Sequence, residues 1–473
     1  MTVLAIDQGT SGTKAVVVDG DRVLGAAELP VRPRYLPDGG VEQDPAELLD
    51  SVLGAGRRAV AEAGAPVDCV GLANQGETVL AWQPRTGDPL GPAVGWQDRR
   101  SGEVCSRLGG AAEVVRQRTG LVLDPYFSAP KMRWIRDQGI TGGVVTTTDS
   151  WLLHRLTGEF VTDAATASRS LLTDLDTAAW DERLLELFGL GGEEMPRVVG
   201  CDEVVGRTTA FGQPTAVGGL VVDQQAALLA QRCLERGEAK CTFGSGAFLL
   251  VNAGSTAARS TSGLSTSLAW RVLGGRAYCL DGQVGTAASA VRWLEQLGLL
   301  DGAEDLDRVA APDSGGVFCA PALAGLSAPW WEPGAQAAFT GMTLSTEAGH
   351  LVKALVDGLA AQVAELADCV ARDLGRPLRR LRVDGGLTRS TVLMQAVADL
   401  VQVEIDVYPS AHATALGAAG FARAALDPGA DLDEVVVDWA PSTGYAPRLS
   451  SGQAADFRAR WRDVVQRSAI GER

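Results

Sequence analysis

Two polar, glycine-rich turns, each set between apolar strand-like runs, constrain this chain more than any other feature of its sequence. The first turn, residues 7–13, joins the apolar runs 3–6 and 15–18, and the second, residues 244–246, interrupts the apolar stretch 241–251. Apolar runs bounded by turn residues are typical of buried strands, so each unit predicts a β-hairpin with a polar tip. Because the two hairpins stand near the starts of the two halves, they favour two lobes that face one ligand.

The rest of the chain alternates strand-like and helix-like stretches, which predicts an α/β fold. Further strands are expected at residues 68–73, 217–222, 381–386 and 403–407. Helices are expected at residues 48–63, 151–156, 224–229, 351–373, 392–401, 412–420 and 458–473. The segment 412–420 is rich in Ala and Gly, which suits close helix packing, and 458–473 is expected to pack on the second lobe. We expect the boundary between the lobes near residues 231–238.

Composition limits the class of protein and its macromolecular partners. The 473 residues are 46% hydrophobic and carry a formal charge of −16, with no 20-residue apolar run free of Pro or charge. The acidic excess argues against nucleic acid or an anionic membrane as partner, but not against a nucleotide ligand, which needs only local donors. The 8 cysteines stand singly, and no leader segment precedes the first strand-like run, so a reduced, cytoplasmic protein is expected.

The first turn combines one carboxylate, Asp7, with hydroxyls and unhindered backbone N–H groups. Such a turn can hold phosphate oxygens and, through Asp7, a Mg²⁺ ion or its water shell. It is not a Walker A loop, because the spacing before Lys14 differs and a strand follows it. Taken alone, a Gly/Ser/Thr turn also serves plain hairpin geometry, and that interpretation stays open.

Asp223 follows the apolar run 217–222 and precedes a helix-like stretch. That position, at the carboxyl end of a strand, is common for catalytic groups in α/β folds. Asp223 could accept a proton from a hydroxyl nucleophile during phosphoryl transfer. The alternative is a helix N-cap, a role for which Asp is strongly preferred.

Nine segments, taken in order, resemble the FGGY family of carbohydrate kinases, and most of all its glycerol kinase branch. The resemblance runs over nearly the whole chain, with its best segments at residues 5–10, 71–78, 96–100, 162–169, 223–228, 243–248, 325–331, 383–386 and 415–419. It implies two ribonuclease-H-like lobes of the actin, hexokinase and Hsp70 type, at residues 1–234 and 235–473. ATP and Mg²⁺ would bind in the cleft, where phosphate passes to a polyol or sugar hydroxyl.

The resemblance also implies a role for individual residues. Asp223 matches the general base and Asp7 the metal site. Nucleotide contacts are implied for Thr10, Ser11, Lys14, Ser245, Ala288, Gly386 and Ser390. The polyol pocket is implied to contain Gly76, Glu77, Tyr126, Asp223, Gln224 and Phe248. Members of the branch often form dimers or tetramers, so a homodimer or homotetramer is one expected state.

One pocket position departs from the branch and leaves the substrate open. Gly76 stands where the branch carries an arginine directly before the pocket glutamate. On sequence alone, the change removes a charged donor and opens space, which would weaken glycerol binding and favour a tetritol, ketopentose or cyclitol. A catalytically silent nucleotide- or sugar-binding sensor is the second alternative, although both Asp7 and Asp223 are retained.

Overall fold

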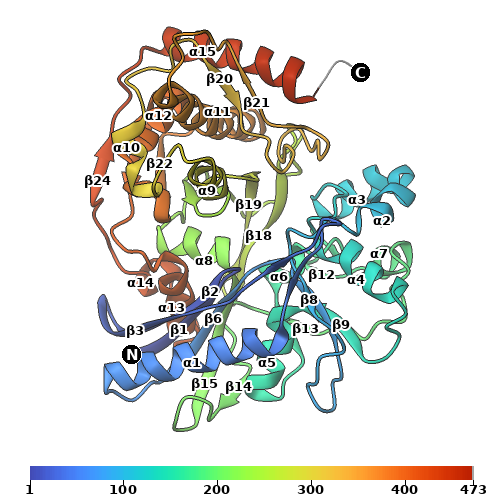
Figure 1. The fold of residues 1–473 in the computed structure, drawn as a ribbon. Coiled ribbons are helices and arrows are strands. Elements are labelled where there is room, and N and C mark those ends of the chain that lie inside the picture. Colours follow the sequence, from blue (N-terminus) through green and yellow to red (C-terminus); the bar gives the residue numbers. More distant parts are fainter. Residues whose placement is uncertain (471–473) are drawn as a thin grey trace.

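The computed structural model describes residues 1–470, and Figure 1 shows them as two lobes stacked on each other. The first lobe is built on a six-stranded sheet in the order β14-β15-β6-β1-β2-β3. Its strands are β1 (Thr2–Gln8), β2 (Gly12–Asp19), β3 (Arg22–Pro30), β6 (Cys69–Asn74), β14 (Gly206–Thr208) and β15 (Thr215–Val222). β1, β6 and β15 run parallel and are almost wholly buried, as expected for a sheet covered on both faces.

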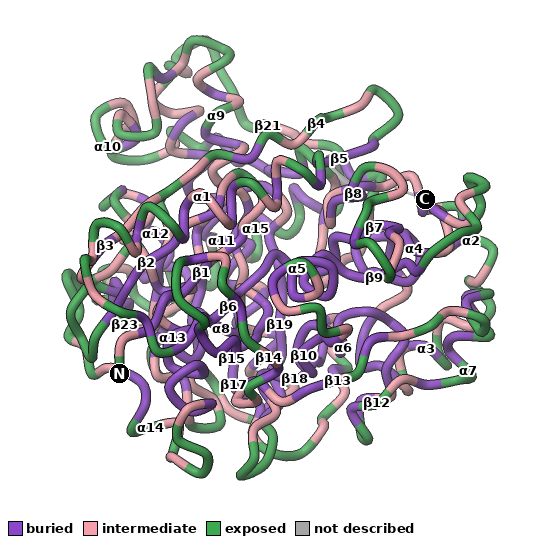
Figure 2. Tube along the Cα trace, turned by 90° about the horizontal axis from the view of Figure 1, so that it is seen from below, coloured by how far each residue is buried: buried purple, intermediate pink, exposed green. Residues whose placement is uncertain are grey.

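Alternate side chains of these strands face two different helices. Leu4 and Ile6 pack with α1 (Pro45–Ala63), whereas Val3 and Ala5 pack with α13 (Ala413–Leu426). Figure 2 shows the buried residues concentrated along these central strands. The period of two that places the helices on opposite faces follows from the pleat of the strand.

A smaller sheet and a set of short helices complete the first lobe. The sheet runs in the order β4-β5-β8-β7-β9, with β4 (Arg34–Tyr35), β5 (Val41–Gln43), β7 (Val79–Trp82), β8 (Ala93–Val94) and β9 (Val144–Thr147). The helices are α2 (Gly102–Arg107), α3 (Ala112–Thr119), α4 (Ser128–Asp137), α5 (Thr148–Thr157), α6 (Ala164–Ser168) and α7 (Glu182–Leu187). This part of the lobe also contains two short strand pairs. They are β10 (Val161–Asp163) with β13 (Arg197–Val199), and β11 (Thr173–Asp174) with β12 (Ala179–Trp180).

The second lobe contains a seven-stranded sheet in the order β18-β19-β17-β16-β22-β23-β24. Its strands are β16 (Ala239–Phe243), β17 (Ala247–Gly254), β18 (Ser265–Val272), β19 (Gly275–Val284), β22 (Arg380–Asp384), β23 (Glu404–Val407) and β24 (Thr443–Tyr445). One face packs in a single core with α9 (Ala288–Gln296), α11 (Ala348–Leu374), α12 (Thr391–Val401) and α15 (Ser451–Val464). The remaining elements are α10 (Leu306–Val309), α14 (Leu432–Val435), and the pair β20 (Phe318–Ala320) and β21 (Ala338–Thr340).

Two helices lie where the lobes meet. α8 (Asp223–Ala230) leaves β15 of the first lobe and packs against β16 and β17 of the second. α13 comes from late in the chain but packs on α8, β15 and β6 (Figure 1). A β-carbon on Gly417 would lie 1.9 Å from the Ala226 carbonyl oxygen, so this crossing requires glycine. The small-residue helix expected from the sequence therefore serves the contact between the lobes.

We expect Gly417→Ala to destabilise the protein by about 1–3 kcal/mol, because the added methyl group overpacks the contact of α13 with the α8 backbone. The matched control is Gly452→Ala in α15, where the added atom has open space and can raise stability by up to about 1 kcal/mol. Urea unfolding of both variants measures the difference. A Gly417→Ala variant as stable as the wild type would contradict the close approach of these helices.

The predicted elements agree with the structure in type and differ by a few residues at their ends. The last helix begins at Ser451, before the expected start at 458, and the side chain of Trp461 is buried and donates to the Cys319 carbonyl oxygen at 2.8 Å. Residues 471–473 of the predicted terminal helix lie outside the described residues. All 8 cysteines are free and buried. Among residues 1–470, no helix has the length and apolar character needed to span a membrane.

Candidate functional site

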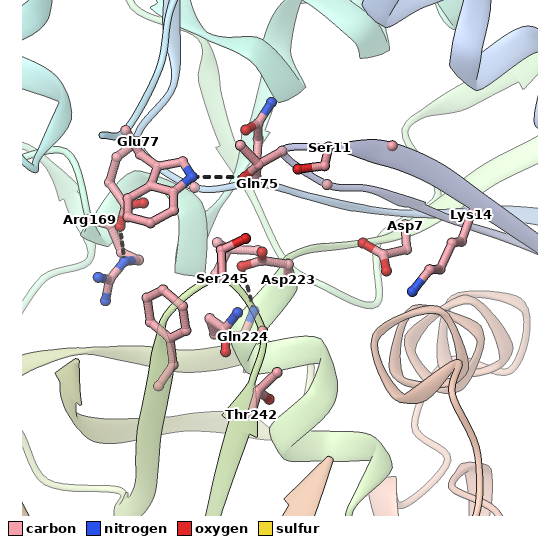
Figure 3. A pocket seen from close by; sticks show the side chains of 18 of the residues that line it. Asp7, Ser11, Lys14, Gln75, Glu77, Arg169, Asp223, Gln224, Thr242 and Ser245 are labelled. Atoms are coloured by element: carbon pink, nitrogen blue, oxygen red, sulfur yellow. Dashed lines mark hydrogen bonds and ion pairs between the residues drawn. The ribbon is translucent and has the colours of Figure 1, made fainter. Parts of the chain in front are cut away.

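A cavity of about 260 Å³ lies between the tips of the two hairpins, the start of α8 and the loop after β6. Figure 3 shows side chains from both lobes pointing into it. Its lining includes eleven of the residues singled out from the sequence, namely Asp7, Thr10, Ser11, Lys14, Gly76, Glu77, Tyr126, Asp223, Gln224, Ser245 and Phe248. The two hairpins therefore do face one cavity.

The first hairpin presents its polar tip to this cavity. In the register of β1 with β2, Asp7 stands opposite Lys14, and the turn closes with Gly9 N donating to Gly12 O at 3.0 Å. The Thr10 hydroxyl accepts a hydrogen bond from the Trp96 indole at 2.8 Å, which ties the turn to the smaller sheet. Ser11 and Lys14 remain directed at the cavity, where they can meet an anion (Figure 3).

The second hairpin is held by the start of α9. The backbone N–H groups of Ala287 and Ala288 donate to the carbonyl oxygens of Ser245 at 2.8 Å and Gly244 at 3.0 Å. A β-carbon on Gly246 would lie 2.6 Å from the Val284 carbonyl oxygen, so only glycine fits this turn. The Ser245 side chain is thereby left on the cavity side of a fixed turn, where a phosphate group could accept its hydroxyl hydrogen.

Three carboxylic acids from three strand ends concentrate negative charge at the centre of the site. Burial, followed by repulsion from Asp223, raises the pKa of Asp7 to about 7. Burial also raises the pKa of Asp223 and of Asp384, and the Lys240 ammonium partly opposes both shifts. Asp384 also accepts hydrogen bonds from Thr242 and Gln231, and three acids gathered in this way favour a cation or a proton among them.

Lys240 and Thr242 connect this acidic group to the second sheet. The buried Lys240 ammonium donates to the Gln224 side-chain oxygen at 2.5 Å and to the Thr242 hydroxyl at 2.8 Å. Thr242 in turn donates to Asp384 Oδ1 at 2.6 Å. The chain of contacts fixes the side chain of Gln224 relative to the acids.

Asp223 itself is not the N-cap of α8. The N-cap position is Val222, and the Asp223 carboxylate interacts with its neighbour Gln224, accepting from the Gln224 backbone N–H at 2.7 Å and meeting the Gln224 side chain. The N-cap interpretation of Asp223 is therefore wrong. Its carboxylate lies free in the cavity, as a group that exchanges protons with a ligand requires.

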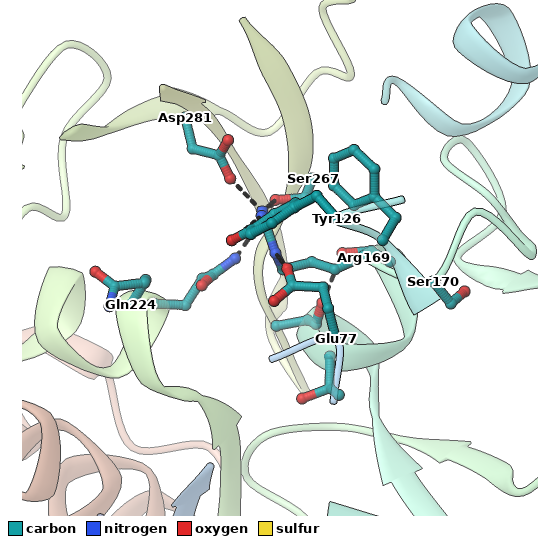
Figure 4. A network of polar contacts seen from close by, with 12 residues as sticks. Glu77, Tyr126, Arg169, Ser170, Gln224, Ser267 and Asp281 are labelled. Atoms are coloured by element: carbon teal, nitrogen blue, oxygen red, sulfur yellow. Dashed lines mark hydrogen bonds and ion pairs between the residues drawn. The ribbon is translucent and has the colours of Figure 1, made fainter. Parts of the chain in front are cut away.

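Glu77 and Arg169 form the opposite end of the cavity. Glu77 has a backbone φ of 60°, a conformation that is costly for a non-glycine residue and that persists where the surroundings impose it. Arg169, directly after α6, donates from Nε to Glu77 and from Nη1 to Asp281 on β19 (Figure 4). Burial raises the pKa of Glu77, and the guanidinium opposes that shift.

Aromatic side chains close this end. Trp96 meets Tyr126 and Phe248 edge to face, with ring centroids 5.7 and 5.9 Å apart. The loop that carries Tyr126 is fixed by the buried Lys131 ammonium, which donates to three successive carbonyl oxygens, those of Pro125, Tyr126 and Phe127, at 2.9, 2.5 and 2.7 Å. A pocket with acid, guanidinium and phenol groups beside aromatic rings suits a small polyhydroxylated ligand.

The structure shows the immediate surroundings of Gly76. A β-carbon at position 76 would lie 2.9 Å from a methyl group of Val222 and 4.0 Å from the Arg169 side chain. A side chain at this position would therefore need Val222 to shift. Arg169 lines the same cavity, so a guanidinium is present there, and the effect of Gly76 on the acceptor stays a prediction.

Three nucleotide candidates lie outside the lining of this cavity. Ala288 begins α9 and supports the second hairpin, Gly386 follows β22, and Ser390 is the N-cap of α12. Ser390 also donates to Asp307 at 2.6 Å. Their candidate roles come from the resemblance alone.

Sequence reasoning missed several residues that the structure brings to the site, namely Arg169, Lys240, Thr242, Asp281 and Asp384. Arg169 ends one of the segments that resemble the family, and Asp384 lies inside another, so both segments contained a signal. Gln75 also lines the cavity, and its buried Oε1 has no hydrogen-bond partner in the described structure.

The donor set fits a magnesium ion bound together with a nucleotide. No group of three or more His, Cys, Asp or Glu side chains within residues 1–470 forms a ready cage for a metal. Mg²⁺ does not need one, because it usually binds one or two carboxylates together with waters and substrate phosphates. Asp7, with its neighbours Asp223 and Asp384, offers the oxygen ligands and the negative charge for such an ion.

Comparison with known proteins gives consistent matches over the whole chain. The family models for the N-terminal and C-terminal domains of the FGGY family of carbohydrate kinases match residues 2–230 and 239–426. Glycerol kinases of Trichlorobacter lovleyi and Thermus brockianus are both 39% identical, with 98% of this chain and 98% of each relative covered.

Solved structures give the same result. A glycerol kinase of Plasmodium falciparum, crystallised with ADP, matches with a TM-score of 0.89 and 30% identity over 100% of this chain and 99% of its own. A xylulose kinase of Rhodospirillum rubrum has the same fold, with a TM-score of 0.84 and 24% identity over 98% of both chains.

Proposed function

The chain belongs to the FGGY family of carbohydrate kinases, and from that premise we propose that it transfers the γ-phosphoryl group of ATP to a hydroxyl of glycerol. It is an enzyme of the carbohydrate and polyol kinase class. The observation that carries the proposal is the position of Asp223 in one cavity with the phosphate-type hairpins on one side and the Glu77–Arg169 pocket on the other.

In this proposal Asp223 is the general base. Its carboxylate accepts the proton of the acceptor hydroxyl as the hydroxyl oxygen attacks the γ-phosphorus and the bond to ADP breaks. A pKa raised by burial suits this role, because a stronger base takes the proton more readily once it is ionised. The neighbouring Lys240 ammonium favours the ionised form of Asp223.

The hairpins are proposed to hold the phosphates of ATP. Phosphate oxygens would accept hydrogen bonds from the backbone N–H groups of both turns. They would also accept from the side chains of Thr10, Ser11 and Lys14 in the first hairpin and of Ser245 in the second. Ala288 would support the second turn, and Gly386 and Ser390 would lie along the nucleoside. Asp7 would hold Mg²⁺, which neutralises charge on the phosphates when bound.

The polyol pocket is proposed to consist of Gly76, Glu77, Tyr126, Asp223, Gln224 and Phe248. Glycerol is favoured over a larger acceptor because the relatives that match the full chain are glycerol kinases. The silent sensor is not favoured either, since acid, hairpins and pocket are all present.

Three further features stay predictions. They are the domain boundary between residues 234 and 235, a homodimeric or homotetrameric state, and a cytoplasmic location. The boundary falls between the two matched family domains, in the segment that follows α8.

The test is ADP release from MgATP, measured with glycerol, glyceraldehyde, tetritols, pentitols, ketopentoses and cyclitols as acceptors. We expect turnover of glycerol at about 1–100 s⁻¹, the usual range for kinases, and much slower turnover of the larger acceptors. If only a larger acceptor is phosphorylated, glycerol is rejected as the substrate. If no acceptor in the panel leads to ADP release, the kinase assignment is rejected.

A further inference from the structure

Arg169 is the one arginine that lines this cavity within the described part of the chain, and the proposed mechanism gives it no task. Its side chain is buried between two carboxylates that belong to different lobes (Figure 4). Glu77 lies in the first lobe after β6, whereas Asp281 lies on β19 of the second lobe. Arg169 therefore joins the lobes at the floor of the polyol pocket.

A count of its donors shows where the guanidinium can still act. A guanidinium has five N–H donors in a fixed fork. On Arg169, Nε donates to Glu77, and Nη1 donates to Asp281 and, over 3.4 Å, to the Ser267 hydroxyl. Nη2 has a single contact, also at 3.4 Å, with the Tyr126 hydroxyl. At this length the contact is weak, so the two hydrogens of Nη2 are largely available to a ligand.

The surroundings hold this fork in one orientation. The Arg169 guanidinium carbon lies 5.7 Å from the ring centres of Tyr126 and of Phe127. Only 6% of its side chain is exposed, and each of its two carboxylate partners is similarly buried. Buried charges with two anchors on separate elements have little freedom to turn, so a donor directed at the cavity is preorganised.

We propose that Arg169 binds the acceptor, with Nη2 donating to a hydroxyl adjacent to the one that Asp223 deprotonates while the same hydroxyl donates to Glu77. This inference rests on the proposed kinase function and adds a specificity-determining residue to it. A hydroxyl that both donates and accepts fits the Glu77–Arg169 pair, whereas a methylene group would leave the Nη2 hydrogens of Arg169 and an oxygen of Glu77 without a hydrogen bond to the ligand. Asp281 sets the fork from the second lobe, so the pocket is complete only with both lobes in place.

The decisive variant is Arg169→Lys, which keeps a cation between Glu77 and Asp281 but removes the fork. We expect kcat/KM for the acceptor to fall about 10- to 100-fold, the range of one hydrogen bond to a charged group, with the KM for MgATP changed less than about twofold. The matched control is Arg100→Lys, since the partly buried Arg100 also lies between two carboxylates, Asp98 and Glu42. Its kinetics should stay at wild-type values.

A comparison of glycerol with 1,3-propanediol and 1,2-propanediol separates contact from general damage. In the wild type, the diol that lacks the hydroxyl held by Arg169 should have a much lower kcat/KM than glycerol. In Arg169→Lys the same deletion should cost at least about 10-fold less, because the contact is already lost. An equal cost in both proteins would overturn the proposal.

Two further arms keep the outcome clear. If Arg169→Lys does not fold, Asp281→Asn decides, since it keeps the Glu77 pair and frees the fork, and an unchanged acceptor KM in that variant would overturn the proposal. If the wild type phosphorylates another acceptor of the panel instead of glycerol, the proposed substrate fails while the same comparison, with deoxy analogues of that acceptor, still tests Arg169.

Discussion

Asp223→Asn is expected to lower kcat by about 10²- to 10⁴-fold, the usual contribution of a general base. The side-chain amide has the size of the carboxylate, and its oxygen can still accept from the Gln224 backbone N–H, as Asp223 does at 2.7 Å. What it cannot do is take a proton from the acceptor hydroxyl. Coupled ADP release with glycerol measures the loss, and activity near the wild-type value would contradict the assignment.

The same substitution is expected to stabilise the nucleotide-free protein at alkaline pH. Burial raises the pKa of Asp223, so the folded protein binds this proton more tightly than the unfolded chain does. Stability from that proton is present below the unfolded pKa and is lost as the pH rises through the folded pKa. The neutral amide removes this loss, so the gain in Tm over the wild type should be larger at pH 8 than at pH 5.

Asp149→Asn is the matched control for the kcat measurement. Asp149 is another buried acid of the first lobe, its pKa is raised by burial, and it accepts from the Thr162 hydroxyl at 2.6 Å, away from the cavity lining. We expect Asp149→Asn to leave kcat within about twofold of the wild-type value. A comparable loss of kcat in both variants would attribute the effect to damage rather than to the base.

The fold was largely predictable because local patterns determine it. The run at residues 217–222 is apolar on both faces, as is typical of a parallel strand that is covered on both faces of its sheet. The structure has β15 there. Gly246 in the second hairpin turn and Gly417 in α13 have close backbone neighbours that exclude side chains, and both lie in glycine-containing segments of the sequence. These features are readable without knowledge of distant contacts.

The composition of the pocket was less predictable because it depends on distant pairs. Arg169 meets Glu77 and Asp281, which are 92 and 112 residues away in the chain, and no local pattern links the three. Comparison of position 76 with the family concerns that residue alone, and it does not reveal the guanidinium that Arg169 brings from another element. The crossing of α13 to the first sheet was equally invisible, since periodicity describes a helix but not its partner.

Asp7→Asn should lower kcat/KM for MgATP by about 10³-fold, since a metal contributes several kcal/mol to phosphoryl transfer. Asp7 ends β1 in the cavity, and burial together with Asp223 raises its pKa to about 7. An amide keeps the size of the side chain but is a much weaker ligand for Mg²⁺. Affinity for ADP in the presence of EDTA should change less than about threefold, because the hairpin donors remain.

The pKa of Asp7 adds a readout that does not depend on catalysis. Near pH 7 the free protein carries this proton part of the time, and a magnesium ligand must be ionised, so binding of Mg·ADP should release a fraction of one proton. Titration calorimetry in two buffers of different ionisation enthalpy measures that release, which Asp7→Asn should remove. Asp163→Asn is the matched control, because burial raises the pKa of Asp163 to about 7 as well, while its carboxylate caps α6 outside the cavity. Proton release that persists in Asp7→Asn but disappears in Asp163→Asn would move the metal away from Asp7.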